Sequence, residues 1–306
     1  MTTKPRIAIV GAGLMGHGIA QVFAAAGHDV RVYDPVEAAL SSLHARVRAN
    51  LSVLGADQNA ADRIMACSVL AQALADADLV IEAAAENLPV KQALFAQIEA
   101  VARSDAILAS NTSVIPIGAI MAGLSRPGRA LGTHWWNPPF LVPLVEVIGT
   151  DQTTAQAIAW TMDLLSQVGM TPVHVRRDVA GFIGNRLQHA LWREAIALVE
   201  QGVCDTQTVD TVVKASFGRR LAVLGPLENA DLVGTDLTLA IHETMLPELN
   251  RDTAPSPYLR DLVRQGRLGM KSGQGFREWP SGTAEEVRHK LMEHLKAARA
   301  PDAGEV

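Results

Sequence analysis

A glycine-rich turn near the start of the chain constrains its fold more than any other feature. The run Gly11-Ala-Gly13-Leu-Met-Gly16 directly follows an apolar, strand-like segment, Ile7–Val10, and opens a helical segment from His17. In such a turn the first glycine permits a tight bend, the second lets the backbone approach a pyrophosphate, and the third lets the helix pack closely on the strand. We therefore predict a Rossmann-type dinucleotide site at the start of a parallel βαβ sheet.

The first half of the chain continues this alternation of short β-branched runs with alanine-rich helical segments, as parallel βαβ units do. Further strands are expected at Asp29–Tyr33, Leu79–Ala83, Ala106–Ser110, Arg129–Thr133, Pro143–Ile148 and Pro172–Val175, the last two at the far edge of the sheet. Helices are expected at His17–Ala26, Val36–Leu54, Val90–Val101 and Thr154–Gln167. The predicted fold class is α/β, with a mostly parallel, doubly wound sheet.

After Asp178 the strand-like runs disappear and the pattern becomes helical. Helices are expected at Asn185–Gln201, Thr206–Ala215, Leu227–Leu249 and Tyr258–Gln265. The tail Thr283–Ala300 is charged and helix-prone, whereas Pro301–Val306 has the composition of a frayed end. We predict two domains: a nucleotide-binding Rossmann domain at residues 1–178 and a smaller all-α C-terminal domain at residues 179–306.

The size and charge of the chain narrow its possible functions. Its 306 residues, 48% of them hydrophobic, are enough for a large buried core and for two domains. The formal net charge is -5 and no long run of Lys or Arg occurs, so nucleic acid is not expected as a partner. Cys67 and Cys204 lie far apart, without a CxxC or His-rich neighbourhood. We interpret them as small buried apolar residues in a reducing cytosol and expect no metal site.

No segment of the sequence predicts an association with a membrane. The N-terminal run that ends at Val10 is too short and too Gly-interrupted for a signal peptide. The longest apolar stretches are interrupted by acidic residues, namely Asp76, Asp78, Glu82 and Glu86. We therefore expect a soluble, cytoplasmic protein.

An acid after the second predicted strand indicates which dinucleotide binds. Asp34 ends the apolar run Val30–Tyr33, eighteen residues after Gly16. A carboxylate at this position suits the two ribose hydroxyls of NAD and repels the 2′-phosphate of NADP. Arg31 is the nearby cation, but it precedes the acid and is expected to point elsewhere. We predict NAD as the cofactor rather than a glycine turn of another kind of α/β protein, with these binding residues: Gly11, Gly13, Leu14, Met15, Gly16 and Asp34.

A histidine after a later strand is the candidate catalytic base. His134 follows the predicted strand Arg129–Thr133, at the end where ligands bind in parallel sheets. The other eight histidines, His174 included, we interpret as structural. A proline-rich turn lies between His134 and Glu146, twelve residues later, so the chain can double back and bring the carboxylate to the imidazole. Glu146 would then fix the tautomer and favour the imidazolium that forms when the other ring nitrogen takes a proton.

Five separated motifs add a more specific signal to the glycine turn. They are Ser110-Asn-Thr-Ser113, His134-Trp-Trp-Asn-Pro-Pro, Leu144-Val-Glu-Val-Ile148, Asp178-Val-Ala-Gly-Phe-Ile-Gly-Asn-Arg186 and Leu268-Gly-Met-Lys-Ser-Gly-Gln-Gly-Phe276. Together they resemble the L-3-hydroxyacyl-CoA dehydrogenase family, in unbroken order from Arg6 to about Trp279. The resemblance implies a Rossmann domain followed by a helical domain that forms a homodimer. It also implies NAD-dependent oxidation of a 3-hydroxyacyl-CoA to the 3-keto product.

The resemblance implies roles for residues at the substrate. His134 becomes the general base that takes the hydroxyl proton while a hydride leaves the same carbon for the nicotinamide C4, and Glu146 becomes its orienting partner. Ser113 and Asn185 would hold the substrate oxygen, and Asn137 is a further substrate-binding candidate. As an alternative to the binding role, Ser113 and Asn185 are helix caps.

The resemblance also implies that Glu86 and Lys91 contact the nicotinamide half of the cofactor. Their alternative interpretation is a surface ion pair. A third alternative concerns the whole chain: a non-catalytic NAD-binding or structural protein could keep the same fold. The presence of all four site residues together argues against this alternative: His134, Glu146, Ser113 and Asn185.

The sequence departs from the family where the CoA nucleotide docks. Relatives that act on CoA thioesters carry a serine and several lysines there, whereas no lysine occurs here between Lys4 and Lys91. Three arginines could supply charge to CoA phosphates, although acids among them weaken this role: Arg46, Arg48 and Arg63. An alternative substrate is therefore a free hydroxy acid.

The segment after the candidate base is consistent with that alternative. Its Asn-Pro-Pro is more like relatives that oxidise free hydroxy acids, such as L-gulonate and carnitine dehydrogenases. Trp135 and Trp136 replace the usual aromatic pair and would narrow the pocket. Arg219 and Arg220 are placed where such relatives could grip a free carboxylate, although surface arginines are the commoner explanation.

Overall fold

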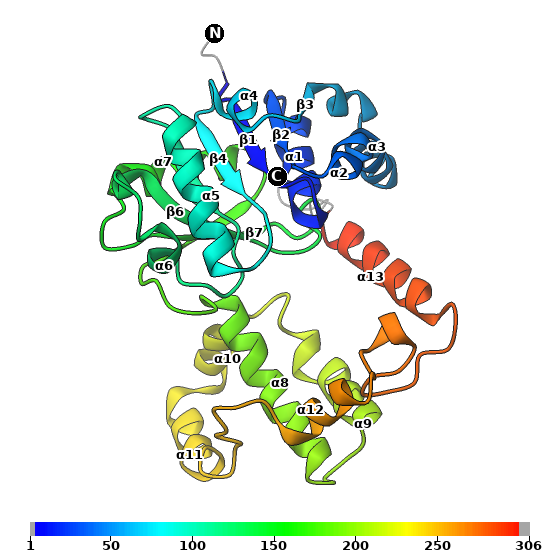
Figure 1. Ribbon diagram of the computed structural model, residues 1–306. Coiled ribbons are helices and arrows are strands. Elements are labelled where there is room, and N and C mark those ends of the chain that lie inside the picture. The colour runs from blue at the N-terminus through cyan, green and yellow to red at the C-terminus, as the bar shows by residue number, and fades with distance from the viewer. Residues whose placement is uncertain (1–3, 300–306) are drawn as a thin grey trace, which may run out of the picture. The chain divides into compact units, whose positions relative to one another are not determined.

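The computed structural model describes residues 4–299, so the predicted frayed end Pro301–Val306 lies outside the described residues. The chain divides into two compact units (Figure 1). The first contains the chain up to Asn185 and the segment from Glu293 onward, and the second contains Arg186–Met292. The predicted division at residues 178/179 falls in the loop that precedes the helix from Gly184, and it stays a prediction.

An eight-stranded sheet forms the centre of the first unit. Its strands are β1 Ile7–Val10, β2 Val30–Tyr33, β3 Ile64–Cys67, β4 Leu79–Glu82, β5 Ile107–Ser110, β6 Ala130–Trp135, β7 Leu144–Ile148 and β8 Thr171–Val175. Their spatial order is β3-β2-β1-β4-β5-β6-β7-β8. The strands from β3 to β6 pair in parallel, β7 runs antiparallel to β6, and β8 is parallel to β7. The predicted mostly parallel sheet is confirmed, with β7 and β8 at its far edge.

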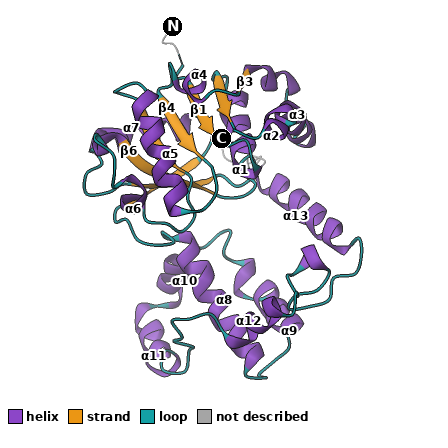
Figure 2. Ribbon diagram, in the orientation of Figure 1, coloured by secondary structure: helices purple, strands orange, loops and turns teal. Residues whose placement is uncertain are grey.

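Helices connect the strands of this unit (Figure 2). They are α1 Leu14–Ala25, α2 Glu37–Ser41, α3 Leu43–Val53, α4 Leu70–Leu74, α5 Leu88–Val101, α6 Ile117–Met121 and α7 Ala155–Gln167. Polar side chains fix where the longer helices begin. The Asn87 side chain accepts a hydrogen bond from the Val90 amide at the start of α5, and Thr154 accepts one from the Ala157 amide at the start of α7.

The structure corrects the sequence prediction in four places of this unit. Strand β3 and the five-residue helices α4 and α6 were absent from the prediction, because elements of four or five residues are too short to show a hydrophobic period. The predicted helix Val36–Leu54 is two helices, α2 and α3, separated at Ser42.

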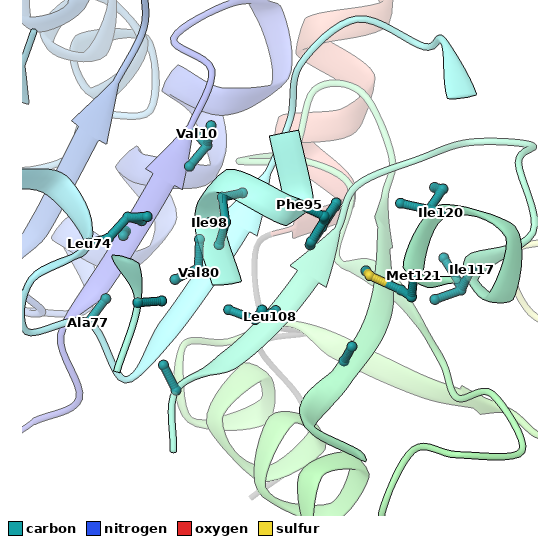
Figure 3. Close-up of a cluster of buried hydrophobic side chains, with 14 of the residues drawn as sticks. Val10, Leu74, Ala77, Val80, Phe95, Ile98, Leu108, Ile117, Ile120 and Met121 are labelled. Atoms are coloured by element: carbon teal, nitrogen blue, oxygen red, sulfur yellow. The ribbon is translucent and has the colours of Figure 1, made fainter. Parts of the chain in front are cut away.

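A cluster of buried apolar side chains packs between one face of the sheet and the helices α5 and α6 (Figure 3). Val10, Val80 and Leu108 come from the neighbouring strands β1, β4 and β5. Their side chains lie on the same face of the sheet, since alternate residues of a strand point to one face. Phe95 and Ile98 supply the opposing side chains from α5. This packing fixes β4 and β5, whose carboxyl ends carry the loops of the candidate site.

The second unit is helical, and the predicted all-α C-terminal domain is confirmed. Its helices are α8 Gly184–Glu200, which begins at the end of the first unit, α9 Thr206–Ala215, α10 Pro226–Val233, α11 Thr235–Met245, α12 Pro257–Arg264 and α13 Thr283–Arg299, which ends in the C-terminal segment of the first unit. The single helix expected at Leu227–Leu249 is two helices, because Gly234 between them has a φ of +107°, outside the helical region.

Two general features complete the description of residues 4–299. Within that range no helix has both the length and the apolar character needed to cross a lipid bilayer. The same range contains no group of three or more His, Cys, Asp and Glu side chains arranged to hold a metal ion. Cys67 is buried and Cys204 partly buried, and both are free thiols.

Candidate active site

The glycine turn between β1 and α1 has the close packing that its sequence predicts. Gly11 has a φ of +112°, which a side chain rarely adopts. A Cβ atom on Gly16 would lie 1.7 Å from the Gly11 carbonyl oxygen, so the turn and the helix are in direct backbone contact. Around Gly13, in contrast, a Cβ would meet no protein atom within 4 Å. The turn is therefore tight on the protein side and open above its middle glycine.

The open side of the turn presents unpaired hydrogen-bond donors. Within residues 4–299 the backbone N–H groups of Gly13, Leu14 and Met15 donate to no protein group. Three consecutive free N–H groups at the start of a helix, next to open space, fit an anionic group such as a pyrophosphate. The residues present thus fit a dinucleotide.

Asp34 follows β2 and contacts this turn directly. One carboxylate oxygen accepts a hydrogen bond from the Ala12 amide at 2.7 Å, and the other accepts one from the Val36 amide at 2.8 Å. The acid is thereby held beside the turn with lone pairs left for further donors. Arg31 points elsewhere, as expected: its guanidinium binds the Gln72 carbonyl oxygen and lies 3.5 Å from Asp76.

His134 and Glu146 meet across the only antiparallel strand pair of the described sheet, β6 and β7. The two residues are direct partners in the register, and His134 Nδ1 lies 2.7 Å from Glu146 Oε2. An ionised carboxylate only accepts, so Nδ1 is the donor and carries the proton. Both side chains are buried, with residue exposures of 4% and 1%. His134 lies within β6 rather than after it, because β6 extends two residues beyond the predicted end at Thr133.

A loop before α8 holds the second oxygen of Glu146. Glu146 Oε1 accepts hydrogen bonds from the Ile183 amide at 2.8 Å and the Gly184 amide at 3.1 Å. Burial alone would raise the pKa of Glu146, but the hydrogen bond from His134 and the two amide bonds outweigh it and hold the pKa below its usual value. Glu146 is therefore a fixed anion behind the imidazole.

Two aromatic rings flank the imidazole of His134. The Trp136 ring centroid lies 5.3 Å and the Phe182 centroid 5.5 Å from that of His134. Phe182 is completely buried and has a φ of +49°, unusual for a residue with a side chain. The loop conformation that delivers the two amides to Glu146 thus also places this ring. Trp135, by contrast, is buried against Phe23.

The second imidazole nitrogen is left without a protein partner in the described part of the chain, and its residue borders a cavity. Within the described residues Nε2 of His134 has no hydrogen-bond partner, and His134 lines a cavity of about 330 Å³. The other lining residues come from the start of α1, the loops after β4 and β5, the end of β6 with the loop after it, and the start of α8: Met15, Ala83, Ala84, Glu86, Asn111, Ser113, Trp135, Trp136, Asn137 and Asn185. The structure therefore brings together Met15, Glu86, Ser113, Asn137 and Asn185, which were predicted separately from the sequence.

Ser113 and Asn185 are neighbours in this cavity. The Asn185 side-chain amide donates to the Ser113 backbone carbonyl at 2.8 Å, and the Ser113 hydroxyl has no partner within residues 4–299. The helix-cap alternatives are wrong for both residues. The N-cap of the helix after Ser113 is Pro116, and Asn185 lies inside the first turn of α8.

Glu86 and Lys91 do not form a surface pair. Glu86 Oε1 accepts hydrogen bonds from the Thr112 hydroxyl and from the amides of Ser113 and Val114, at 2.6, 2.9 and 3.2 Å. Burial opposes ionisation of Glu86, but these bonds and the nearby Lys91 ammonium hold its pKa below the usual value. Glu86 thus fixes the loop that carries Ser113.

Lys91 lies beneath this loop with no exposed side-chain surface. Its ammonium is 2.7 Å from Glu82 Oε1 and 3.5 Å from Glu86 Oε2. The Ser110 hydroxyl donates to the other oxygen of Glu82 at 2.6 Å. This geometry therefore does not support the predicted direct contact between Lys91 and the cofactor. Glu82 was missed from the sequence because an acid inside an apolar strand gave no sign of its buried partner.

The arginines considered for CoA phosphates are engaged elsewhere. Arg48 pairs with Asp62, and Arg63 lies 3.9 Å from Asp29. Arg46 donates to the carbonyl oxygens of Ala12 and Ala39, both at 2.8 Å. Each of the three guanidinium groups therefore has a protein contact.

Comparison with protein families gives two consecutive matches, which together span residues 6–279. Residues 6–179 match the family described as 3-hydroxyacyl-CoA dehydrogenase, NAD binding domain. Residues 181–279 match the C-terminal domain of the same enzyme family. NAD is therefore the cofactor that the first of these domains binds.

Individual relatives include enzymes with different substrates. The chain is 35% identical over 275 residues to 5-formyl-3-hydroxy-2-methylpyridine 4-carboxylate 5-dehydrogenase of Mesorhizobium japonicum, which covers 88% of this chain and 89% of the relative. It is 38% identical over 283 residues to a probable 3-hydroxybutyryl-CoA dehydrogenase of Deinococcus radiodurans, covering 89% and 99%. It is also 38% identical over 233 residues to L-carnitine dehydrogenase of Streptomyces coelicolor, covering 75% and 73%.

Solved structures show the same range. The crystal structure of the pyridine carboxylate 5-dehydrogenase, described as an NAD+ dependent dismutase, matches with a TM-score of 0.90 at 33% identity and covers 96% of this chain and 97% of that one. The structure of (S)-3-hydroxybutyryl-CoA dehydrogenase PaaH1 from Ralstonia eutropha matches with a TM-score of 0.75 at 34% identity and covers 90% and 99%.

Proposed function

The chain belongs to the 3-hydroxyacyl-CoA dehydrogenase family, and we propose that it oxidises the secondary hydroxyl of an L-3-hydroxyacyl substrate to a ketone with His134 as general base. Membership makes it an NAD-dependent oxidoreductase that acts on a CH–OH group. The observation that carries the proposal for His134 is the 2.7 Å hydrogen bond from its Nδ1 to Glu146, at a residue that lines a cavity and whose Nε2 has no partner within the described residues.

The hydrogen bond determines which nitrogen acts. Because the Nδ1 proton is held by Glu146, Nε2 of the neutral ring carries the free lone pair. Nε2 takes the hydroxyl proton, the carbon–oxygen bond becomes double, and the hydride leaves the same carbon. Bound NAD supplies the acceptor for that hydride. Glu146 stabilises the imidazolium that results, and the product proton then leaves from Nε2 to solvent.

The other polar groups of the cavity suit the oxygen that changes. The free Ser113 hydroxyl and the second N–H of the Asn185 amide are donors on the cavity wall, and we assign them to the substrate oxygen. Asn137 lines the same cavity and is assigned to the rest of the substrate. On the cofactor side, we assign Gly11, Gly13, Leu14, Met15, Gly16 and Asp34 to NAD, with Glu86 at the nicotinamide end.

A second candidate substrate is a small free carboxylate rather than a CoA thioester. The specific observation in its favour is the TM-score of 0.90 to the pyridine carboxylate dehydrogenase, against 0.75 to the (S)-3-hydroxybutyryl-CoA dehydrogenase PaaH1. The engagement of Arg48 and Arg63 with acids, which leaves them fewer contacts for CoA phosphates, points the same way. In this alternative His134 and Glu146 keep their roles.

A panel of substrates tests both candidates. NADH formation is measured with L-3-hydroxybutyryl-CoA, free 3-hydroxybutyrate, carnitine, gulonate and a hydroxymethyl- or formyl-pyridine carboxylate, each with NAD. Turnover of the thioester with a kcat/KM at least tenfold above the free acids supports the first candidate. Turnover of a free acid alone supports the second. NADH binding without turnover of any compound would contradict both candidate substrates. It would support the alternative of a non-catalytic NAD-binding protein.

We further propose that the helical unit forms a homodimer. Helices α10 and α11 contain no buried residue, and large apolar side chains on them are exposed, among them Leu227, Leu232 and Leu239. Such a surface is typical of a protein interface. Analytical ultracentrifugation tests this: a dimer is expected, and a monomer at micromolar concentration would contradict it.

A further inference from the structure

The carbonyl groups of the glycine turn are held from the side opposite the free N–H groups. Arg46, in α3, donates from one guanidinium nitrogen to the Ala12 carbonyl at 2.8 Å, and its other nitrogen lies 3.4 Å from the Gly13 carbonyl. That same Gly13 carbonyl accepts from His17 Nδ1 at 2.8 Å and from the His17 backbone N–H at 3.2 Å. Two side chains from different helices thus bind two successive peptide groups of the turn.

Because a peptide group is planar, a contact that holds its carbonyl also fixes the direction of its N–H group. In a trans peptide the C=O and the following N–H point in opposite directions. Holding the Ala12 carbonyl therefore orients the Gly13 N–H, and holding the Gly13 carbonyl orients the Leu14 N–H. These are two of the donors that have no protein partner within the described residues.

We propose that Arg46 and His17 are positioning residues that preset the Gly13 and Leu14 N–H groups for the pyrophosphate of NAD. The proposal depends on the docking of NAD on the glycine turn, and it adds two residues outside the glycine motif. A preset donor costs no reorganisation when the anion arrives, so binding is tighter than to a turn whose peptide groups can rotate.

The surroundings of both side chains suit this role. Arg46 is half-buried, and a further hydrogen bond to the Ala39 carbonyl fixes its guanidinium at a second point. His17 is buried in the first turn of α1, and burial lowers its pKa. The neutral ring keeps the proton on Nδ1, because a carbonyl oxygen only accepts.

Arg46→Met tests the proposal, with Arg48→Met as the matched control. Arg48 lies two residues further along the same helix, but pairs with Asp62 instead of the turn. Competition with NADH fluorescence gives the affinities for ADP, which carries the pyrophosphate, and for adenosine, which does not. We expect Arg46→Met to weaken ADP and NADH about tenfold and adenosine less than twofold, while kcat at saturating NAD changes less than twofold. Arg48→Met should change none of these values.

Three outcomes would overturn the positioning role. ADP affinity within twofold of wild type would show that the turn needs no support from Arg46. An equal loss for ADP and adenosine would indicate a general structural defect. A loss of ADP affinity that disappears at about 0.5 M NaCl would assign Arg46 to long-range charge attraction, which salt screens.

A second variant keeps the test decisive where Arg46→Met fails to fold. His17→Leu removes the imidazole donor to the Gly13 carbonyl, leaves the backbone N–H of residue 17 on that carbonyl, and leaves Arg46 in place. The same selective loss of ADP over adenosine is expected. Failure of wild-type protein to bind NADH at all would instead contradict the docking of NAD on the turn, which separates the two proposals.

Discussion

Glu146 binds both the imidazole of His134 and the backbone before α8: one carboxylate oxygen accepts from Nδ1 at 2.7 Å and the other accepts from the Ile183 amide at 2.8 Å. The carboxylate therefore cannot rotate without breaking a hydrogen bond on its other side. The orientation of the imidazole is fixed by the strand register and by this loop together, and not by a flexible side-chain contact.

Glu146→Gln should lower kcat roughly 10- to 100-fold while NADH affinity changes less than twofold. The neutral amide keeps the size of the carboxylate but no longer stabilises the imidazolium. Steady-state rates and NADH titration check this, with the exposed Glu37→Gln as control. A kcat equal to that of wild type would remove Glu146 from the mechanism.

The same variant should change how stability depends on pH. Burial raises the pKa of Glu146, but the bonds from His134, Gly184 and Ile183 hold it below the usual value. A carboxyl with a lowered folded-state pKa contributes stability that is present above its unfolded pKa and is lost as pH falls through the folded pKa. The Tm of wild type should therefore fall more steeply than that of Glu146→Gln in this acidic range. Parallel Tm curves for the two proteins would contradict this.

Alanine substitutions at two glycines of the turn should affect different properties: cofactor affinity at Gly13 and stability at Gly16. A Cβ on Gly13 meets no protein atom within 4 Å, so Gly13→Ala should keep the wild-type Tm but weaken NADH about tenfold or more, because the methyl group occupies the approach of the pyrophosphate. A Cβ on Gly16 would lie 1.7 Å from the Gly11 oxygen, so Gly16→Ala should destabilise the protein by about 2 kcal/mol or more. Thermal melts and NADH titration measure both. Unchanged NADH affinity of Gly13→Ala would place the cofactor elsewhere.

Lys91→Met should destabilise the fold by about 3–5 kcal/mol, because it leaves Glu82 buried without its counter-charge. Urea unfolding measures the loss, and the exposed Lys290→Met serves as control. Adding Glu82→Gln to Lys91→Met should recover part of the stability, since the uncompensated charge is then gone. A loss below 1 kcal/mol in the single variant would show that the pair contributes little.

Much of the fold was predictable because long elements carry repeated signals. The glycine turn after Ile7–Val10 and the alternation that follows were enough for the parallel sheet, and the loss of strand-like runs after Asp178 was enough for the helical unit. Short elements were not predictable. Strand β3 has four residues with no β-branched residue after Ile64, so it lacks both length and composition.

The candidate site was predictable where chemistry and spacing coincide in the sequence. The eleven residues between His134 and Glu146 include the turn that the antiparallel pair requires, and the structure brings the two side chains together. The positions of Lys91 and Arg46 were not predictable. Their partners, Glu82 and the Ala12 carbonyl, are set by packing between elements, and a cation in a helix gives no local sign of burial.

The rate of NADH formation by His134→Gln, with the substrate that the panel identifies, tests the central claim most directly. Loss of the general base should lower kcat roughly 10²- to 10⁴-fold, while the NADH dissociation constant stays within twofold of wild type. Turnover equal to that of wild type would show that the proton leaves by another route and would contradict the assignment of His134.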